Sequence, residues 1–240
     1  MGTGHQLCGY GSFVRVSRFD HGPKRPGACL ASDRWEGIRC WLAEVDRSKV
    51  VVATKTYKPS FEGALEDVEQ ARVELDTDYL DVFMLHGLNT LEEWERFQPT
   101  LAGLMEAKAR GWVHHVGMST HTVTLTREAA HHPEIEVLLV TLNKTGKVMK
   151  RSGTAEEMQA AMRVLYEQGR GIYIMKSLAR GRVFSEESGP SKLTPRVVDE
   201  ALTYVFQCPW AHSVAIGMRS VAELEENVAV EQRVDADIGK

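Results

Sequence analysis

The sequence lacks several features that would assign a protein to a class at first sight. It has only four cysteines, with neither a Cys-x-x-Cys pair nor the spacing of zinc ligands: Cys8, Cys29, Cys40 and Cys208. This pattern favours reduced cysteines in a cytosolic chain over a disulfide framework. No apolar run approaches the roughly 20 residues of a membrane span, and the first residues do not resemble a signal peptide. We therefore expect a cytoplasmic protein with no membrane partner.

An excess of charge of one sign is also missing. The chain carries 29 Lys and Arg against 33 Asp and Glu, which gives a formal net charge of −4. Binding to nucleic acid or to an anionic membrane requires a basic surface, so neither partner is expected. With 240 residues, 43% of them hydrophobic, the chain is long enough to bury one sizeable core.

The glycine-rich turn of a dinucleotide-binding open sheet is a third absence. Such a turn follows the first strand of that fold. The nearest match, Gly-Tyr-Gly-Ser-Phe-Val at residues 9–14, has no third glycine and follows no convincing strand. From about residue 33 onward, apolar runs of strand length alternate with helical patterns. This alternation indicates parallel strands joined by right-handed crossovers. We therefore predict an α/β fold, a (β/α) TIM-type barrel.

The expected elements leave this barrel incomplete. Strands are predicted at residues 49–54, 80–85, 113–118, 136–142, 171–176 and 212–217. Helices are predicted at 34–45, 61–75, 93–110 and 155–168, and helix starts at Thr90, Thr154, Thr194 and Ser220. A complete barrel has eight strand–helix units, so the first one or two units are expected to be missing.

The missing units would leave the strand at 49–54 with an open edge. Unpaired backbone groups along such an edge need a cover, from residues 1–32 or from a partner. Residues 1–32 are rich in Gly, Arg and Pro and have no clear strand period. We predict that they form an atypical N-terminal segment and that residues 33–240 form the barrel.

Two of the predicted strands end in a titratable side chain. Lys55 follows the apolar run 50–54, and His86 follows the apolar run 82–85. The carboxyl ends of the strands form the active-site face of a (β/α) barrel. Either residue alone would suit a solvated rim, but matching positions on successive strands favour a shared catalytic pocket.

Five segments, at residues 47–55, 76–86, 111–119, 171–181 and 216–227, carry a family resemblance. In this order they resemble parts of the aldo/keto reductases. The parts are the strand with the catalytic lysine, the strand with the catalytic histidine, and the strand whose serine contacts the nicotinamide amide. Residues 171–181 resemble the seventh strand with its phosphate-side loop, and residues 216–227 resemble the final strand with its adenosine-binding helix. The resemblance is closest to the bacterial-type branch of predicted oxidoreductases.

The resemblance implies NAD(P)H-dependent reduction of a small-molecule aldehyde or ketone. In the family, a hydride passes to the carbonyl carbon while a tyrosine protonates the oxygen, which must be stabilised as it gains charge. A lysine activates this tyrosine, an aspartate holds the lysine, and a histidine orients the carbonyl. Lys55 and His86 match two of these four roles.

The aspartate and the tyrosine, five residues apart in the family, have no matching pattern in residues 1–48. Two interpretations are open. In one, Tyr10 is the catalytic tyrosine, with His5 at the aspartate position. In the other, residues 1–32 are unrelated sequence, from a frameshift or a misplaced gene start. The protein would then be a pseudoenzyme or a truncated barrel, which binds the nucleotide without reductase turnover.

The resemblance also assigns cofactor-binding positions, which are Ser119, Asn143, Met175, Arg180, Arg219, Glu226 and Asn227. Met175 replaces an aromatic residue that stacks on the nicotinamide. Arg219 is the cation best suited to a 2′-phosphate, so NADP is expected, with NAD as the alternative. Asn143 could equally cap a turn, and Glu226 could belong to a solvated helix face. No metal site is expected, because His114 and His115 are adjacent on a strand and point to opposite faces.

Overall fold

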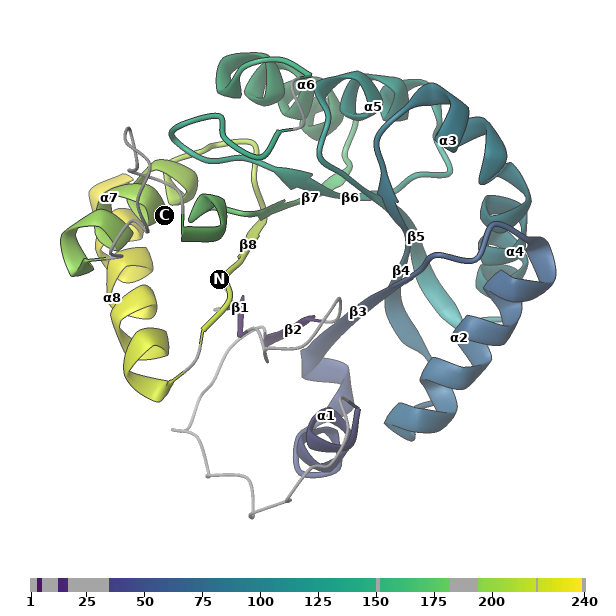
Figure 1. Ribbon diagram of the computed structural model, residues 1–240. Coiled ribbons are helices and arrows are strands. Elements are labelled where there is room, and N and C mark those ends of the chain that lie inside the picture. Colours follow the sequence, from purple (N-terminus) through teal and green to yellow (C-terminus); the bar gives the residue numbers. More distant parts are fainter. Residues whose placement is uncertain are drawn as a thin grey trace. The chain divides into compact units, whose positions relative to one another are not determined.

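The computed structural model describes residues 4–5, 13–16, 35–149, 152–181, 194–218 and 220–238. Figure 1 shows strands alternating with helices along the chain. The chain divides into two compact units, Met1–His86 with Glu95–Gly117, and Gly87–Trp94 with Met118–Lys240. Strands β4 (Leu80–Leu88) and β5 (Val113–Thr120) contribute residues to both units.

In the first unit the strand order is β1-β2-β3-β4-β5. Strands β1 (Gly4–His5) and β2 (Phe13–Val16) pair antiparallel, and β2 pairs antiparallel with β3 (Val50–Thr56). Strand β3 then pairs parallel with β4. The open edge expected at the first parallel strand is therefore covered by β2. Strand β2 belongs to the segment 1–32, in which the sequence shows no clear strand period, because β2 is defined by its pairing with β3.

The helices of the first unit follow the predicted apolar stripes. Helix α1 (Glu36–Leu42) is followed by the short η1 (Arg47–Lys49), and α2 (Phe61–Leu75) has its predicted bounds. The Ser60 side chain caps α2 by accepting a hydrogen bond from the Gly63 backbone N–H at 3.1 Å. Figure 1 shows α2 beside α4 (Gln98–Ala109).

The single helix predicted at residues 93–110 is instead two helices, α3 (Leu91–Arg96) and α4. Phe97 separates them with φ −93° and ψ 7°, and Pro99 lies in the first turn of α4. Proline has no backbone N–H and its ring clashes with the carbonyl four residues earlier, so it ends one helix and starts the next.

The second unit has the strand order β5-β6-β7-β8. Strands β6 (Val137–Thr141), β7 (Gly171–Met175) and β8 (Ser213–Ala215) are parallel. Its helices are α5 (Val123–Glu128), η2 (Ala129–His131), α6 (Ala155–Glu167), η3 (Ala179–Gly181), α7 (Pro195–Phe206) and α8 (Val221–Ile238). A complete capping box joins Thr154 and Glu157 at the start of α6, as predicted.

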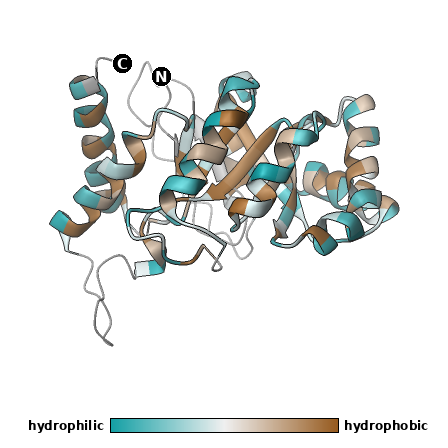
Figure 2. Ribbon diagram, turned by 90° about the horizontal axis from the view of Figure 1, so that it is seen from above, coloured by the Kyte–Doolittle hydropathy of each residue, from teal (hydrophilic) through white to brown (hydrophobic). Residues whose placement is uncertain are grey.

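The core of each unit consists of strand residues and one side of each helix. All five residues of β6 are buried, which is typical of a strand covered on both faces. In Figure 2 the helices carry hydrophobic and hydrophilic residues in alternation along their length, as helices with one buried stripe do. In the described part of the chain, no helix is long and apolar enough to cross a membrane.

The cysteines differ in part from the expectation. Cys208 is a buried thiol, but Cys40 is disulfide-bonded. The prediction of four reduced cysteines is therefore wrong for Cys40. The spacing of cysteines along the sequence does not show which of them lie close together in space. No short sequence motif predicts the disulfide bond of Cys40.

Candidate active site

Lys55 and His86 lie on one face of the sheet, toward the carboxyl ends of neighbouring parallel strands. Lys55 in β3 is the register partner of Met84 in β4. Side chains alternate between the faces of a sheet, so His86, two residues beyond Met84, shares the face of Lys55. Both side chains are partly exposed. The structure thus brings together the two catalytic residues expected from the sequence.

The opposite face of β3 is turned toward α2. Thr56 donates a hydrogen bond from Oγ1 to the Asp67 carboxylate of α2 at 2.5 Å. Because Thr56 and Lys55 are neighbours on the strand, their side chains point to opposite faces. Lys55 and His86 therefore face away from the covering helix, as the active-site residues of a (β/α) fold do.

Tyr57 is a third polar residue at this end of the strands. Its hydroxyl lies 3.0 Å from His86 Nε2, within hydrogen-bond distance. The two ring centroids are 3.8 Å apart and the planes meet at 31°. The family pattern did not identify Tyr57. The signal that could have found it is the strand period, which places residues 55 and 57 on one face.

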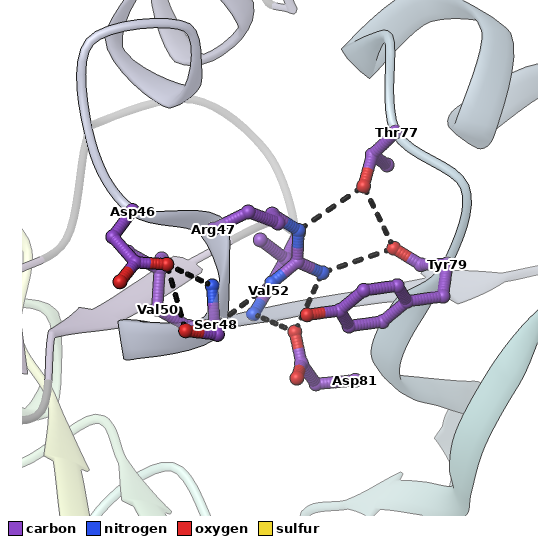
Figure 3. Close-up of polar contacts among 8 residues, drawn as sticks. All are labelled: Asp46, Arg47, Ser48, Val50, Val52, Thr77, Tyr79 and Asp81. Carbon is purple, nitrogen blue, oxygen red and sulfur yellow. Dashed lines mark hydrogen bonds and ion pairs between the residues drawn. The ribbon is translucent and has the colours of Figure 1, made fainter.

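The register of β3 against β4 is held at its amino end by Arg47 (Figure 3). The Arg47 guanidinium donates to the Asp81 carboxylate at 2.7 Å, and Asp81 also accepts the Val52 backbone N–H at 2.8 Å. Further bonds from Arg47 reach Thr77 Oγ1 and the Tyr79 carbonyl. Each charge-assisted hydrogen bond of this kind contributes about 1.5–3 kcal/mol. Because register decides which face each side chain occupies, this network fixes Lys55 beside His86.

In the second unit, Ser119 and Asn143 are both buried near strand ends. Ser119 is the penultimate residue of β5, and its Oγ accepts the Gly87 backbone N–H at 2.8 Å. Asn143 follows β6 and organises a turn. Its amide donates to the Lys147 carbonyl at 2.8 Å, and its Oδ1 accepts the Thr145 hydroxyl at 2.9 Å. These are the contacts expected of a turn cap, and contact with a nicotinamide stays a prediction.

The turn after β7 gathers two cations. Met175 ends the strand, and Lys176, Ala179, Arg180 and Gly181 all have φ between 46° and 78°. Burial, and then the charge of Arg180, lower the pKa of Lys176 below its usual 10.5. A turn that holds two neighbouring cations is suited to an anion, which would relieve their repulsion.

The remaining cofactor candidates lie at or near α8. Ser220 accepts the Glu223 backbone N–H at 3.2 Å, which caps the helix start as predicted. Glu226 is exposed, whereas Asn227 is 8% exposed. Two further candidates, Tyr10 and Arg219, lie outside the residues that the structure describes. The predicted roles of Tyr10 and Arg219 rest on the sequence alone.

Parallel strands that alternate with helices and carry polar groups at their carboxyl ends define an α/β protein of the (β/α)-barrel class. The model of the aldo/keto reductase family matches residues 35–194, about two thirds of the chain. This chain therefore belongs to the aldo/keto reductase family.

Two curated relatives agree with this assignment. The uncharacterized oxidoreductase YqkF of Bacillus subtilis is 22% identical over 223 residues, which cover 84% of this chain and 66% of that protein. The L-galactose dehydrogenase of Arabidopsis thaliana is 25% identical over 240 residues, which cover 89% of this chain and 73% of the relative. The chain thus spans slightly less than two thirds of the length of YqkF.

Solved structures establish the fold. The holo form of the aldo-keto reductase AKR11C1 from Bacillus halodurans matches with a TM-score of 0.63 and 21% identity, over 81% of this chain and 71% of that one. The thermostable aldo-keto reductase Tm1743 matches with a TM-score of 0.60 and 19% identity, over 83% and 75% of the two chains. The predicted (β/α)-barrel fold is confirmed, and the match covers only part of each complete barrel.

Proposed function

We propose that this protein binds a reduced nicotinamide dinucleotide and uses it to reduce the carbonyl group of a small aldehyde or ketone. The observation that carries the proposal is the placement of Lys55 and His86 on one sheet face, in a chain of the aldo/keto reductase family. The cytoplasm remains the proposed location on the grounds of charge and hydropathy, but the disulfide of Cys40 does not support it.

Lys55 and His86 are the residues that would contact the carbonyl group of the substrate. A carbonyl oxygen gains negative charge as its carbon is reduced, and a neighbouring cation or hydrogen-bond donor stabilises that charge. Lys55 supplies a cation and His86 a ring N–H donor on the same face. A bound reduced nicotinamide would supply the hydride. The protein's own task is to orient the carbonyl, stabilise the oxygen and deliver a proton.

The residues of the second unit fit an anionic dinucleotide. The lowered pKa of Lys176 beside Arg180 marks a turn where an added phosphate group would be stabilised. Ser220 at the start of α8 adds a helix N-terminus, which attracts anions. Ser119, Asn143, Met175, Glu226 and Asn227 complete the proposed binding residues. Arg219 favours NADP over NAD, because a guanidinium binds phosphate in a bidentate manner.

The test is a pair of measurements on the purified chain and on Lys55→Met. Fluorescence titration gives the Kd for NADPH and NADH, and NADPH oxidation at a series of aldehydes gives turnover. We expect NADPH to bind more tightly than NADH. Lys55→Met should lower kcat by about 10²-fold or more while leaving the Kd for NADPH unchanged.

The matched control is Lys49→Met, which removes the same charge from an exposed lysine just before the amino end of β3. It should leave both kcat and Kd unchanged. A chain that binds neither nucleotide would contradict the proposed function. NADPH binding without turnover on any aldehyde or ketone would instead support the pseudoenzyme alternative.

A further inference from the structure

Tyr57 and His86 form a pair at the carboxyl ends of β3 and β4. Tyr57 follows the last residue of β3, and its side chain is 65% exposed. Its hydroxyl is nevertheless fixed in position by the 3.0 Å contact with His86 Nε2 and by the close approach of the two rings. An exposed phenol held by a histidine is reachable by a small molecule and already oriented.

Lys55 belongs to the same face. The register of β3 with β4 places Lys55 opposite Met84, one strand period before His86. Tyr57 lies two residues after Lys55, just past the end of β3. A phenol, an ammonium and an imidazole are therefore presented together from two adjacent strands of the first unit.

We propose that Tyr57 is the proton donor of the carbonyl reduction. This inference rests on the proposed function and departs from the family pattern, in which the donor tyrosine lies upstream of the helix now seen as α1. In this proposal His86 carries its ring proton on Nε2 and donates it to Tyr57 Oη, 3.0 Å away, and Tyr57 gives its own proton to the substrate.

The substrate carbon gains a hydride from the reduced nicotinamide, and the C=O π pair moves to oxygen. The Tyr57 O–H bond breaks, and a new O–H bond forms on the product alcohol. The electron pair of the broken bond stays on the phenolate, which the His86 N–H stabilises until water returns the proton.

The discriminating experiment compares Tyr57→Phe with Tyr10→Phe and Tyr79→Phe in the full-length chain. Tyr57→Phe removes only the hydroxyl and keeps the ring against His86. Tyr79→Phe is the matched control, because Tyr79 also stacks on a histidine, His114, at 4.3 Å, but lies just before β4 rather than near its end. NADPH affinity, kcat and KM are measured for each variant, with far-UV circular dichroism to establish folding.

We expect Tyr57→Phe to lower kcat by about 10²–10⁴-fold, the usual contribution of general acid catalysis. The Kd for NADPH should not change, and Tyr79→Phe should behave like the parent. The double variant Tyr57→Phe/His86→Gln should lose less activity than the sum of the losses in the two single variants, because His86 acts in part through Tyr57.

Two outcomes would overturn the role of Tyr57 while leaving the proposed function intact. One is turnover that survives Tyr57→Phe but is lost in Tyr10→Phe, which would place the donor in the N-terminal segment. The other is a raised KM with unchanged kcat, which would make Tyr57 a substrate-contact residue only. A parent chain that binds NADPH without turnover, or does not bind it, would overturn the donor role together with the proposed function.

Discussion

The surroundings of Lys176 oppose the positive charge of its side chain. Burial and the neighbouring Arg180 lower its pKa below the 10.5 expected in the unfolded chain. Between the lowered value and 10.5 the unfolded state binds more protons, so the free energy of unfolding rises with pH across that window. At neutral pH this partly buried charge lowers the free energy of unfolding, but only slightly, because the side chain keeps some contact with solvent.

We therefore predict that Lys176→Met raises the free energy of unfolding at neutral pH by about 0.5 kcal/mol after solvent screening. The variant should also flatten the rise in stability toward alkaline pH. Urea unfolding across that range measures both effects. Lys58→Met is the contrasting control, because Asp67 and Glu66 raise the pKa of Lys58 and its charge stabilises the fold below that value. A Lys176→Met variant less stable than the parent at neutral pH would contradict this account.

Single residues differ in how well their roles could be predicted from the sequence. Lys55 and His86 could be found because each ends an apolar run, and strand ends have a defined place in this fold. Tyr57 was missed because its partner, His86, is 29 residues away in the sequence. The Asn143 contacts show that a residue at a strand end can be engaged by its own turn.

Among the secondary-structure elements, α2 and α4 approach each other closely at Gly103. A Cβ added at Gly103 would lie 2.6 Å from the Phe61 carbonyl oxygen and 2.9 Å from the Ala64 Cβ. The first of these neighbours is backbone and cannot swing aside. The helix–helix spacing in this unit therefore depends on the absence of a side chain at Gly103.

We predict that Gly103→Ala lowers the free energy of unfolding by about 1–3 kcal/mol, the usual cost of overpacking a core. This cost should exceed the gain of about 1 kcal/mol that alanine brings to a helix interior. Denaturant unfolding of Gly103→Ala measures the difference. Ala102→Ser, at the exposed neighbouring position, should change stability by less than about 0.5 kcal/mol. Equal stability of Gly103→Ala and the parent would show that the helices can move apart freely.

Element positions were the most predictable level of the structure. The predicted strand at 49–54 is seen at residues 50–56, and α6 begins at its predicted capping box. Apolar periodicity and capping are local signals, so they can be read without the fold. The break between α3 and α4 was missed because their apolar stripes continue across Pro99. Strand β2 was missed because its hydrogen-bond partner is distant in sequence.

At the scale of the whole molecule, the parallel strands begin at β3, and β2 covers its edge. Residues Phe13–Val16 pair with Ala53–Val50 in antiparallel register. We predict that a variant reduced to residues 35–240 aggregates, because it exposes an unpaired strand rich in valine. Size-exclusion chromatography and thermal unfolding compare it with the full chain. A monomeric 35–240 variant that unfolds cooperatively at the same temperature would show that β2 contributes nothing to the stability of the fold.

The contacts of Arg47 have a further consequence, for the order in which the chain folds. The ion pair between Arg47 and Asp81 joins residues only 34 positions apart, so closing that loop costs little chain entropy. We predict that the segment from η1 through β3 and α2 to β4 forms early, before strands with more distant partners meet. Substitution of Asp81 should accordingly slow refolding more than it speeds unfolding. The arginine that sets the register of β3 and β4 would thus also set how fast these two strands are assembled.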